Sequence, residues 1–302
     1  MEEKKFTARL RNIEEVKFPI VKAAFQGKEG NVYIGLMMVD TGSANCILSK
    51  SVLQLIDKEG LQLKDKKMNI RSVQSRGTIC QGYNFTFKMC NGKFSDVFYV
   101  NEEFDFNEFI DGFIGIIGHE FLRKHKLVLD YPSQTLHASD GQLDISSDNI
   151  DFFFPMEFGL KNYNIPVVGL VNGDKEYVMV TDSGANNTVL TKHVLDESGF
   201  KSGKIESRGS VMGFSNEALE SSIQSVDLCL LSIGGTEENP KICRYSDNLQ
   251  IVDKYLHIMD GLKDSEGREL LPISGLLSSQ FMLNHKWILD FGLGVIYSRK
   301  SA

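Results

Sequence analysis

Short apolar runs of strand length recur along this chain, and one arrangement of apolar and polar positions occurs twice. Residues 36–39 form an apolar run that ends in an Asp-Thr-Gly triplet at residues 40–42. Residues 177–180 form a second run, which leads through one threonine into an Asp-Ser-Gly triplet at residues 182–184. Such runs are typical of buried β-strands. A carboxylate placed directly after a buried strand is costly unless it is hydrogen-bonded or functional, so Asp40 and Asp182 are the first candidates for chemistry.

The likeness between the two regions extends past the triplets. With an offset of 142 residues (182 − 40), residues 49–53 fall on residues 191–195. Each segment predicts the start of a helix with its first hydroxyl residue as N-cap. Gly60 and Gly199 stand where these helices would end.

Residues 114–131 match residues 274–291 with an offset of 160 (290 − 130), and His125 and His285 hold equivalent positions. The offset grows by 18 residues, so the second half carries extra residues between its anchors. The chain is therefore an internal duplication. The shared histidine position predicts a structural role in each repeat.

These motifs resemble aspartic proteases, in which an Asp-Thr/Ser-Gly loop, a hairpin and an apolar-Gly segment before a short helix build one lobe. Two lobes in one chain resemble the pepsin arrangement. The compact repeats, the Asp-Ser-Gly-Ala variant and the Phe-Leu…Leu-Asp-Tyr ending are more similar to retropepsins fused in tandem. The resemblance spans residues 18 to 297.

The resemblance implies an all-β fold with a few short helices. Two β-barrel-like lobes related by a pseudo-twofold axis would hold the active site between them. We place an N-terminal lobe carrying Asp40 at residues 1–148 and a C-terminal lobe carrying Asp182 at residues 149–302. Residues 140–154 are predicted to connect the lobes, with Phe152, Phe153 and Phe154 packing between them.

Two equivalent aspartates brought together by such an axis would share one proton and activate a water held between them. The resemblance thus implies an aspartic endopeptidase that hydrolyses peptide bonds. The alternative is a catalytically silent module that binds peptides in the same cleft. Retention of both aspartates and both neighbouring hydroxyls favours the enzyme.

The resemblance also implies supporting roles for residues around the two aspartates. The hydroxyls of Thr41 and Ser183 would cross-link the two loops. Gly42 and Gly184 would donate N–H groups to the carboxylates. Gly115 and Gly275 would let the apolar-Gly segments pack beneath the loops. The loops differ at Ser43 and Ala185, where a hydroxyl would hydrogen-bond the outer oxygen of its aspartate.

A β-ribbon is predicted after each of the two helices. In the resembled family such hairpins are flaps that close over a bound peptide, and an ordinary exposed hairpin fits the sequence equally well. The flap candidates for substrate binding are Gln74, Ser75, Arg76, Gly77, Met212, Gly213 and Phe214.

The composition limits the classes of molecule that the protein is expected to bind. The chain of 302 residues has a net charge of −7, which argues against nucleic acid because phosphate binding needs a basic face. Its five cysteines form no Cys-x-x-Cys pair, and no metalloprotease His-Glu-x-x-His spacing is present. We expect a monomer that needs no cofactor and acts on a peptide or an unfolded protein.

The first five residues carry no apolar core of a signal peptide, and no later run is long enough to span a membrane. The sequence as written predicts a cytoplasmic protein without a membrane partner. An exported bacterial protein whose signal has been removed fits the same pattern.

Overall fold

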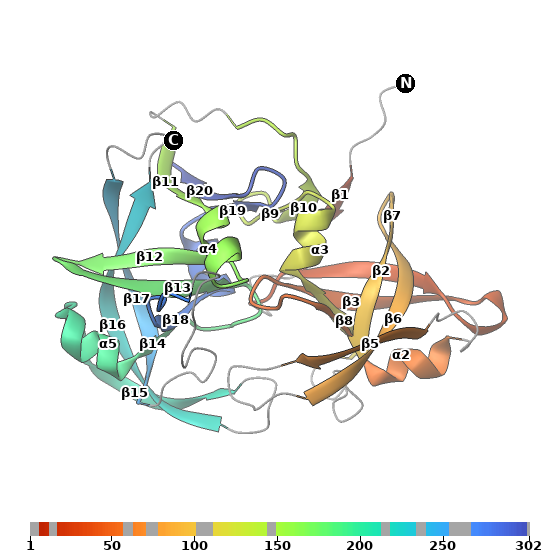
Figure 1. Cartoon of the computed structure of the whole chain (residues 1–302), viewed down its shortest axis with the longest axis horizontal. Helices are drawn as coiled ribbons and strands as arrows, with labels where there is room; N and C mark the ends of the chain where they lie inside the picture. The colour runs from red at the N-terminus through yellow and green to blue at the C-terminus, as the bar shows by residue number, and fades with distance from the viewer. Residues whose placement is uncertain are drawn as a thin grey trace.

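The computed structural model describes residues 6–11, 17–56, 63–70, 78–100, 111–143, 149–212, 218–233, 240–253 and 267–300, with the backbone alone at residues 63–70, 78, 212 and 218. Within these ranges the chain is mostly β-structure arranged in three sheets (Figure 1). Two sheets form barrels, one on each side of the view, and the third joins them at the top.

The first barrel contains, among the described residues, six strands that pair in the order β2, β3, β8, β4, β7 and β6. A pairing of Ala24 with Lys88 joins β2 to β6 and closes the ring, while β5 extends the sheet beyond β6. Buried phenylalanines fill the interior, and the rings of Phe85 and Phe98 lie 5.2 Å apart. The strands are β2 (Ile20–Gln26), β3 (Val32–Asp40), β4 (Cys46–Leu48), β5 (Leu63–Ile70), β6 (Thr78–Met89), β7 (Gly92–Val100) and β8 (Phe113–Gly118).

The second barrel repeats this arrangement in the described part of the second half. Its ring runs β12, β13, β18, β14, β17 and β16, a pairing of Leu170 with Leu230 closes it, and β15 extends it beyond β16. The strands are β12 (Val167–Asn172), β13 (Lys175–Asp182), β14 (Val189–Thr191), β15 (Ser202–Met212), β16 (Ala218–Ile233), β17 (Pro240–Val252) and β18 (Ile273–Ser278). This strand-by-strand equivalence confirms the predicted all-β fold with two barrel lobes.

The third sheet takes strands from both halves in the order β1, β10, β9, β19, β20 and β11, and we call it the interlobe sheet. The two halves meet where β9 pairs with β19, with Leu129 opposite Leu289. Its strands are β1 (Thr7–Arg9), β9 (Leu127–Asp130), β10 (Thr135–Ala138), β11 (Ile150–Pro155), β19 (Trp287–Asp290) and β20 (Val295–Arg299). The proposed division of the chain at residues 148 and 149 stays a prediction.

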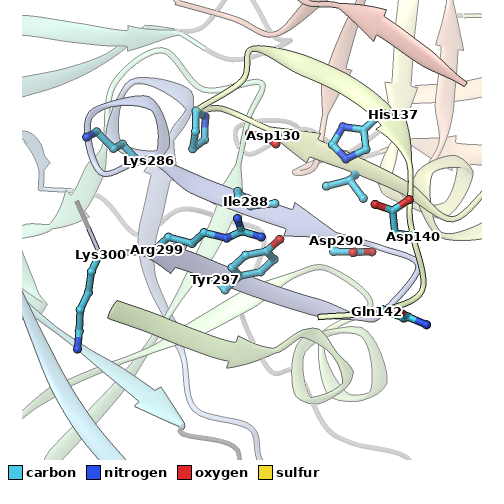
Figure 2. A pocket seen from close by; sticks show the side chains of 12 residues that line it. Asp130, His137, Asp140, Gln142, Lys286, Ile288, Asp290, Tyr297, Arg299 and Lys300 are labelled. Atoms are coloured by element: carbon cyan, nitrogen blue, oxygen red, sulfur yellow. The ribbon is translucent and has the colours of Figure 1, made fainter. Parts of the chain in front are cut away.

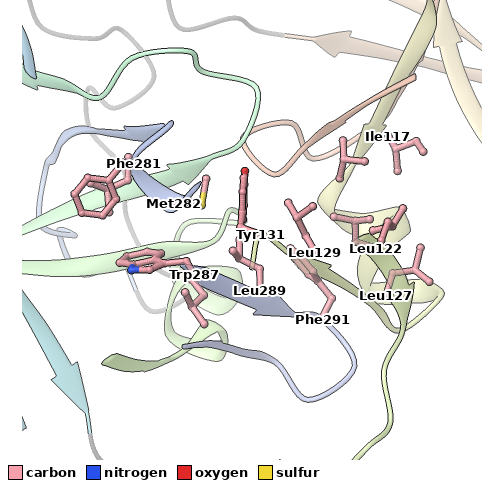
Figure 3. Packing of buried hydrophobic residues seen from close by; sticks show 14 of the residues in the cluster. Ile117, Leu122, Leu127, Leu129, Tyr131, Phe281, Met282, Trp287, Leu289 and Phe291 are labelled. Carbon is pink, nitrogen blue, oxygen red and sulfur yellow. The ribbon is translucent and has the colours of Figure 1, made fainter. Parts of the chain in front are cut away.

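One face of the interlobe sheet packs into the main hydrophobic core (Figure 3). Leu129, Leu289 and Trp287 are fully buried there, and Trp287 stacks on Phe152 at 4.6 Å. Phe154 belongs to the same core, as the sequence predicts for the aromatic run after the connection. Burial of these large apolar side chains stabilises the contact between the two barrels.

Short helices flank the barrel strands in equivalent pairs, α2 (Lys50–Leu55) with α5 (Lys192–Ser198) and α3 (His119–Lys124) with α6 (Ser279–Asn284). A further helix, α4 (Met156–Asn162), follows β11, and a 3₁₀ turn, η1 (Lys28–Gly30), lies between β2 and β3. None of the described helices is long and apolar enough to cross a bilayer.

The predicted N-cap residues lie at the predicted positions, but their side chains do not make the expected capping hydrogen bonds. Ser49 and Thr191 do precede α2 and α5, but neither side chain makes a capping hydrogen bond. Gly199 ends α5 with a left-handed φ of 69°, as expected for a C-terminal glycine. Helix α2 is followed by Ile56, and Gly60 lies outside the described residues.

The two equivalent histidines have matching surroundings. The ring of His125 lies 4.3 Å from that of Phe121, and the ring of His285 lies 4.4 Å from that of Phe281. Each Nε2 faces one carboxylate, Asp96 at 3.8 Å in the first lobe and Asp247 at 4.0 Å in the second. The same packing in both lobes confirms the predicted structural role.

Candidate active site

Asp40 and Asp182 are the last residues of β3 and β13, the strands that pair in parallel with β8 and β18 near the middle of each barrel. Both strands are buried along the residues that precede the aspartates. The apolar-Gly strands pass close beside β4 and β14. A Cβ on Gly115 would lie 2.3 Å from the Ile47 oxygen, and one on Gly275 would lie 2.1 Å from the Val189 oxygen. Only glycine allows this approach.

Two hydroxyl residues connect the loops that follow these strands. The Thr41 N–H donates to Ser183 Oγ at 2.9 Å, and the Ser183 N–H donates to Thr41 Oγ1 at 2.9 Å. Each hydroxyl also donates across the interface, Thr41 to the Thr181 oxygen at 2.6 Å and Ser183 to the Val39 oxygen at 2.7 Å. These four buried hydrogen bonds fix the two loops relative to each other.

The glycines of the two triplets bring the carboxyls into contact. A Cβ on Gly42 would lie 2.5 Å from Cγ of Asp182, and a Cβ on Gly184 would lie 2.5 Å from Cγ of Asp40. Each glycine therefore faces the carboxyl of the opposite loop at a distance that no other residue allows. Each also donates its N–H to its own aspartate at 2.9 Å.

Both carboxyls have raised pKa values, and burial is the largest cause in each. Burial raises the pKa of Asp40, the charge of Asp182 and their mutual hydrogen bond raise it further, and it lies well above the ordinary value. Burial also raises the pKa of Asp182, but the hydrogen bond to Asp40 and the N–H groups of Gly184 and Ala185 oppose the increase. Asp40 is 6% exposed, whereas Asp182 is only partly buried. Two carboxyls in contact cannot both ionise easily, so the pair favours one shared proton.

The sequence predicts that the Ser43 hydroxyl hydrogen-bonds Asp40, and the structure shows a different partner. The Ser43 hydroxyl donates to the Asn45 oxygen at 2.8 Å, so its single hydrogen is not available to Asp40. The backbone N–H of Ser43 reaches Asp40 Oδ1 instead, at 3.2 Å. Since Ala185 also has this N–H, the expected contrast between a hydroxyl and a methyl group beside the aspartates is wrong.

The flap candidates remain predictions. Gln74, Ser75, Arg76, Gly77, Gly213 and Phe214 lie outside the described residues, and Met212 is the last residue of β15, where only the backbone is described. The strands that lead to these positions, β5 and β15, occupy equivalent places in the two lobes. They lie at the lower edge of the view, away from the interlobe sheet (Figure 1).

Sequence reasoning missed three buried polar residues beneath the two loops, His119, Tyr131 and Ser279. The Tyr131 hydroxyl lies 3.0 Å from Ser279 Oγ, and the pKa of the phenol responds to the charges of both aspartates. His119 lies beside the backbone of Thr41 and Ser43. The repeat alignment contains the signal that could have revealed them, because Tyr131 aligns with phenylalanine and His119 with serine.

A pocket of about 450 Å³ lies on the interlobe sheet (Figure 2). Its lining includes the carboxylates of Asp130 and Asp140 from the first half and of Asp290 from the second, together with the basic side chains of Lys286 and Arg299. Neither Asp40 nor Asp182 lines it, so the pocket does not belong to the site built by the two loops.

No protein-family model matches the sequence, and no curated protein matches it. Among solved structures the chain resembles the aspartic proteinase from Irpex lacteus, with a TM-score of 0.50 and 12% sequence identity. The superposition covers 98% of this chain and 97% of that one. At this identity the likeness concerns the fold alone, and it extends over the whole of both chains. The protein therefore has the two-lobed β-fold of an aspartic proteinase.

Proposed function

We propose that this chain is an aspartic endopeptidase, with Asp40 and Asp182 as the catalytic residues. The observation that carries the proposal is the contact of two carboxyls from equivalent loops, each placed against the triplet glycine of the other loop. Two acids in contact in a buried site are costly to maintain, and their raised pKa values are typical of groups poised for proton transfer.

The reaction needs one carboxyl with a proton and one without. We assign the ionised role to Asp182, the more exposed member, which takes a proton from a water held between the carboxyls while the water oxygen bonds to the carbonyl carbon of the substrate. Asp40 gives its proton to the carbonyl oxygen in the same step. In the second step the protonated Asp182 gives its proton to the nitrogen of the diol and the C–N bond breaks, while the ionised Asp40 takes a proton from one diol hydroxyl. The products are a free carboxylic acid and an amine, and the pair returns to its starting protonation.

The supporting residues contribute by holding the carboxyls in position. The reciprocal bonds between Thr41 and Ser183 prevent the loops from separating, and the N–H groups of Gly42 and Gly184 fix one oxygen of each carboxyl. Fixed dipoles of this kind need no reorganisation during the reaction, which is the main source of electrostatic catalysis. A displacement of about 1 Å would be expected to cost about 100-fold in rate.

The substrate we propose is a peptide or an unfolded protein segment bound in extended form between the lobes. Such a segment offers the amide bonds on which a carboxyl pair acts. Both carboxyls come from one chain, which supports a site that is complete in the monomer.

The test is cleavage of an unfolded, fluorescently labelled protein at pH values from 3 to 8. We expect wild-type protein to cut it and Asp182→Asn to lose nearly all activity. Asp174→Asn is the matched control, because Asp174 is exposed in the turn between β12 and β13. Equal cleavage by wild type and Asp182→Asn would contradict the proposal. Saturable binding of the labelled protein without cleavage would indicate a peptide-binding module instead.

A further inference from the structure

The two repeats differ directly beneath the carboxyl pair. The offset of 160 residues pairs Tyr131 with Phe291 and Ser279 with His119. The matching helices begin with Ser279 and His119, and the matching strands lead into Tyr131 and Phe291. All four side chains are buried. One side of the pseudo-twofold axis therefore carries two hydroxyls, whereas the other carries an imidazole and a phenyl ring.

Tyr131 extends from the interlobe sheet toward the loops. Figure 3 shows its ring standing near Leu129 and Leu289 with the hydroxyl directed away from them. The side chain is 1% exposed, and its hydroxyl lies 3.0 Å from Ser279 Oγ, which is fully buried. The hydroxyl of Ser183 lies close enough to lower the pKa of the phenol. The phenol of one lobe thus meets the hydroxyls of the other lobe.

Ser279 passes this contact on to the Asp182 loop. Its N–H donates to the Ala185 oxygen at 3.0 Å, one residue beyond the Gly184 N–H that holds Asp182. In the first lobe, the His119 N–H makes the equivalent bond to the Ser43 oxygen at 2.8 Å. The backbone support is therefore common to both loops.

The hydroxyl link exists on one side only. Phe291 has no hydroxyl, and the His119 ring, whose Nδ1 has no hydrogen-bond partner, meets the backbone of Thr41 and Ser43 instead. The Asp182 loop is thus attached to the interlobe sheet through a pair of hydroxyls, whereas the Asp40 loop is contacted by an imidazole from α3. A buried hydroxyl pair of this kind costs desolvation, which a phenylalanine would avoid at no loss of packing.

We infer that Tyr131, acting through Ser279, is a positioning residue that holds the Asp182 loop in its reactive geometry and makes the two halves of the carboxyl pair inequivalent. The inference rests on the proposed function. Tyr131 does not touch the reacting atoms. It acts on the Ser183 hydroxyl and on the loop whose N–H groups favour the ionised form of Asp182.

Tyr131→Phe removes one oxygen and leaves a residue that the second repeat already accommodates at the matching position. We expect kcat to fall about tenfold with KM unchanged, because one buried hydrogen bond is lost. The loosened N–H groups should raise the pKa of Asp182, so the acidic limb of the pH profile should move to higher pH. The titratable groups whose charges act on the phenol are Asp40 and Asp182.

Ser279→Ala should reproduce the effect, and the double variant should be little worse than either single one, since both remove the same link. Tyr245→Phe is the control, because it removes the oxygen of another buried phenol, whose ring packs on His285 and Trp287. It should leave kcat and the pH profile unchanged. Wild-type kinetics and an unshifted profile in Tyr131→Phe would overturn the inference.

A second readout separates this inference from the proposed function. The carboxyl carbons of Asp40 and Asp182, labelled with ¹³C, can be titrated by NMR in wild type and in Tyr131→Phe without any substrate. A shifted titration of Asp182 in the variant supports the positioning role even if no peptide is cleaved. An identical titration in the two proteins would overturn it, whatever the activity.

Discussion

Thr41 and Ser183, 142 residues apart, each donate a backbone N–H to the hydroxyl of the other at 2.9 Å. Each hydroxyl in turn donates to a carbonyl of the opposite strand. The two residues are fully buried, so water cannot replace any of these bonds. The relation between the lobes at the site is therefore fixed by hydrogen bonds, while apolar packing fixes it in the interlobe sheet.

Removing one hydroxyl should show how much this connection contributes. Thr41→Ala removes the hydroxyl that accepts from the Ser183 N–H and donates to the Thr181 oxygen, so we expect a loss of about 2 kcal/mol in the free energy of unfolding. Thr41→Ser keeps the hydroxyl and should lose less than about 1 kcal/mol. Chemical denaturation measures both. The control is Thr135→Ala, because Thr135 is the half-buried first residue of β10. Equal losses in the free energy of unfolding in all three variants would contradict the role of the cross-link.

Asp40 and Asp182 should behave as one unit in kinetics. Asp40→Asn and Asp182→Asn should each abolish most activity, and the double variant should be little worse than either, because effects within one catalytic unit are not additive. The measurement is kcat/KM for the three variants on the same labelled protein. Two partial losses that multiplied in the double variant would show that the carboxyls act independently.

The sequence was sufficient to predict the lobes and the two aspartates because both depend on local patterns that occur twice. A buried run that ends in an acid and a glycine is costly for packing alone, and the repeat offset then places the two acids at equivalent strand ends. The glycines at 115 and 275 could be predicted because each precedes two apolar residues at a matched position of the repeat.

What the sequence could not give depends on contacts between distant residues or on the choice among several nearby acceptors. Tyr131 reads as an apolar core residue at a strand end, and only the pairing of β9 with β19 brings its hydroxyl to Ser279. The Ser43 hydroxyl could be expected to bond either Asp40 or the Asn45 oxygen. In the folded turn it donates to the Asn45 oxygen. Neither hydrogen bond can be predicted from the spacing of residues along the chain.

The hydroxyl geometry changes the pH behaviour expected of the two loops. If Ser43 bonded Asp40, Ser43→Ala would move the activity profile to higher pH and Ala185→Ser would move it lower. Because the hydroxyl is committed to Asn45, both variants should leave the limbs of kcat/KM against pH within about 0.3 units of wild type. A clear shift in either variant would show that the hydroxyl turns toward the aspartate during the reaction.

His119 should make the folded protein sensitive to acid. Burial lowers the pKa of His119 from 6.5 to about 4, and the nearby backbone oxygens offset this only in part. An unfolded chain binds a proton on this ring near pH 6.5, whereas the folded chain does so only near pH 4. Between these values the unfolded state holds more protons, so stability contributed by the neutral ring is present above pH 6.5 and is lost as the pH falls.

The comparison that isolates this effect is wild type against His119→Gln, followed by chemical denaturation from pH 7.5 to pH 4. The difference in the free energy of unfolding between the two proteins should shift by about 3 kcal/mol in favour of the variant over this range. His125 and His285, whose pKa values are also lowered, and the carboxyl pair, whose values are raised, are present in both proteins and cancel. His193→Gln, on the exposed face of α5, is the matched control for the substitution itself. A difference between wild type and His119→Gln that stays constant with pH would mean that the folded protein protonates His119 as readily as the unfolded chain does.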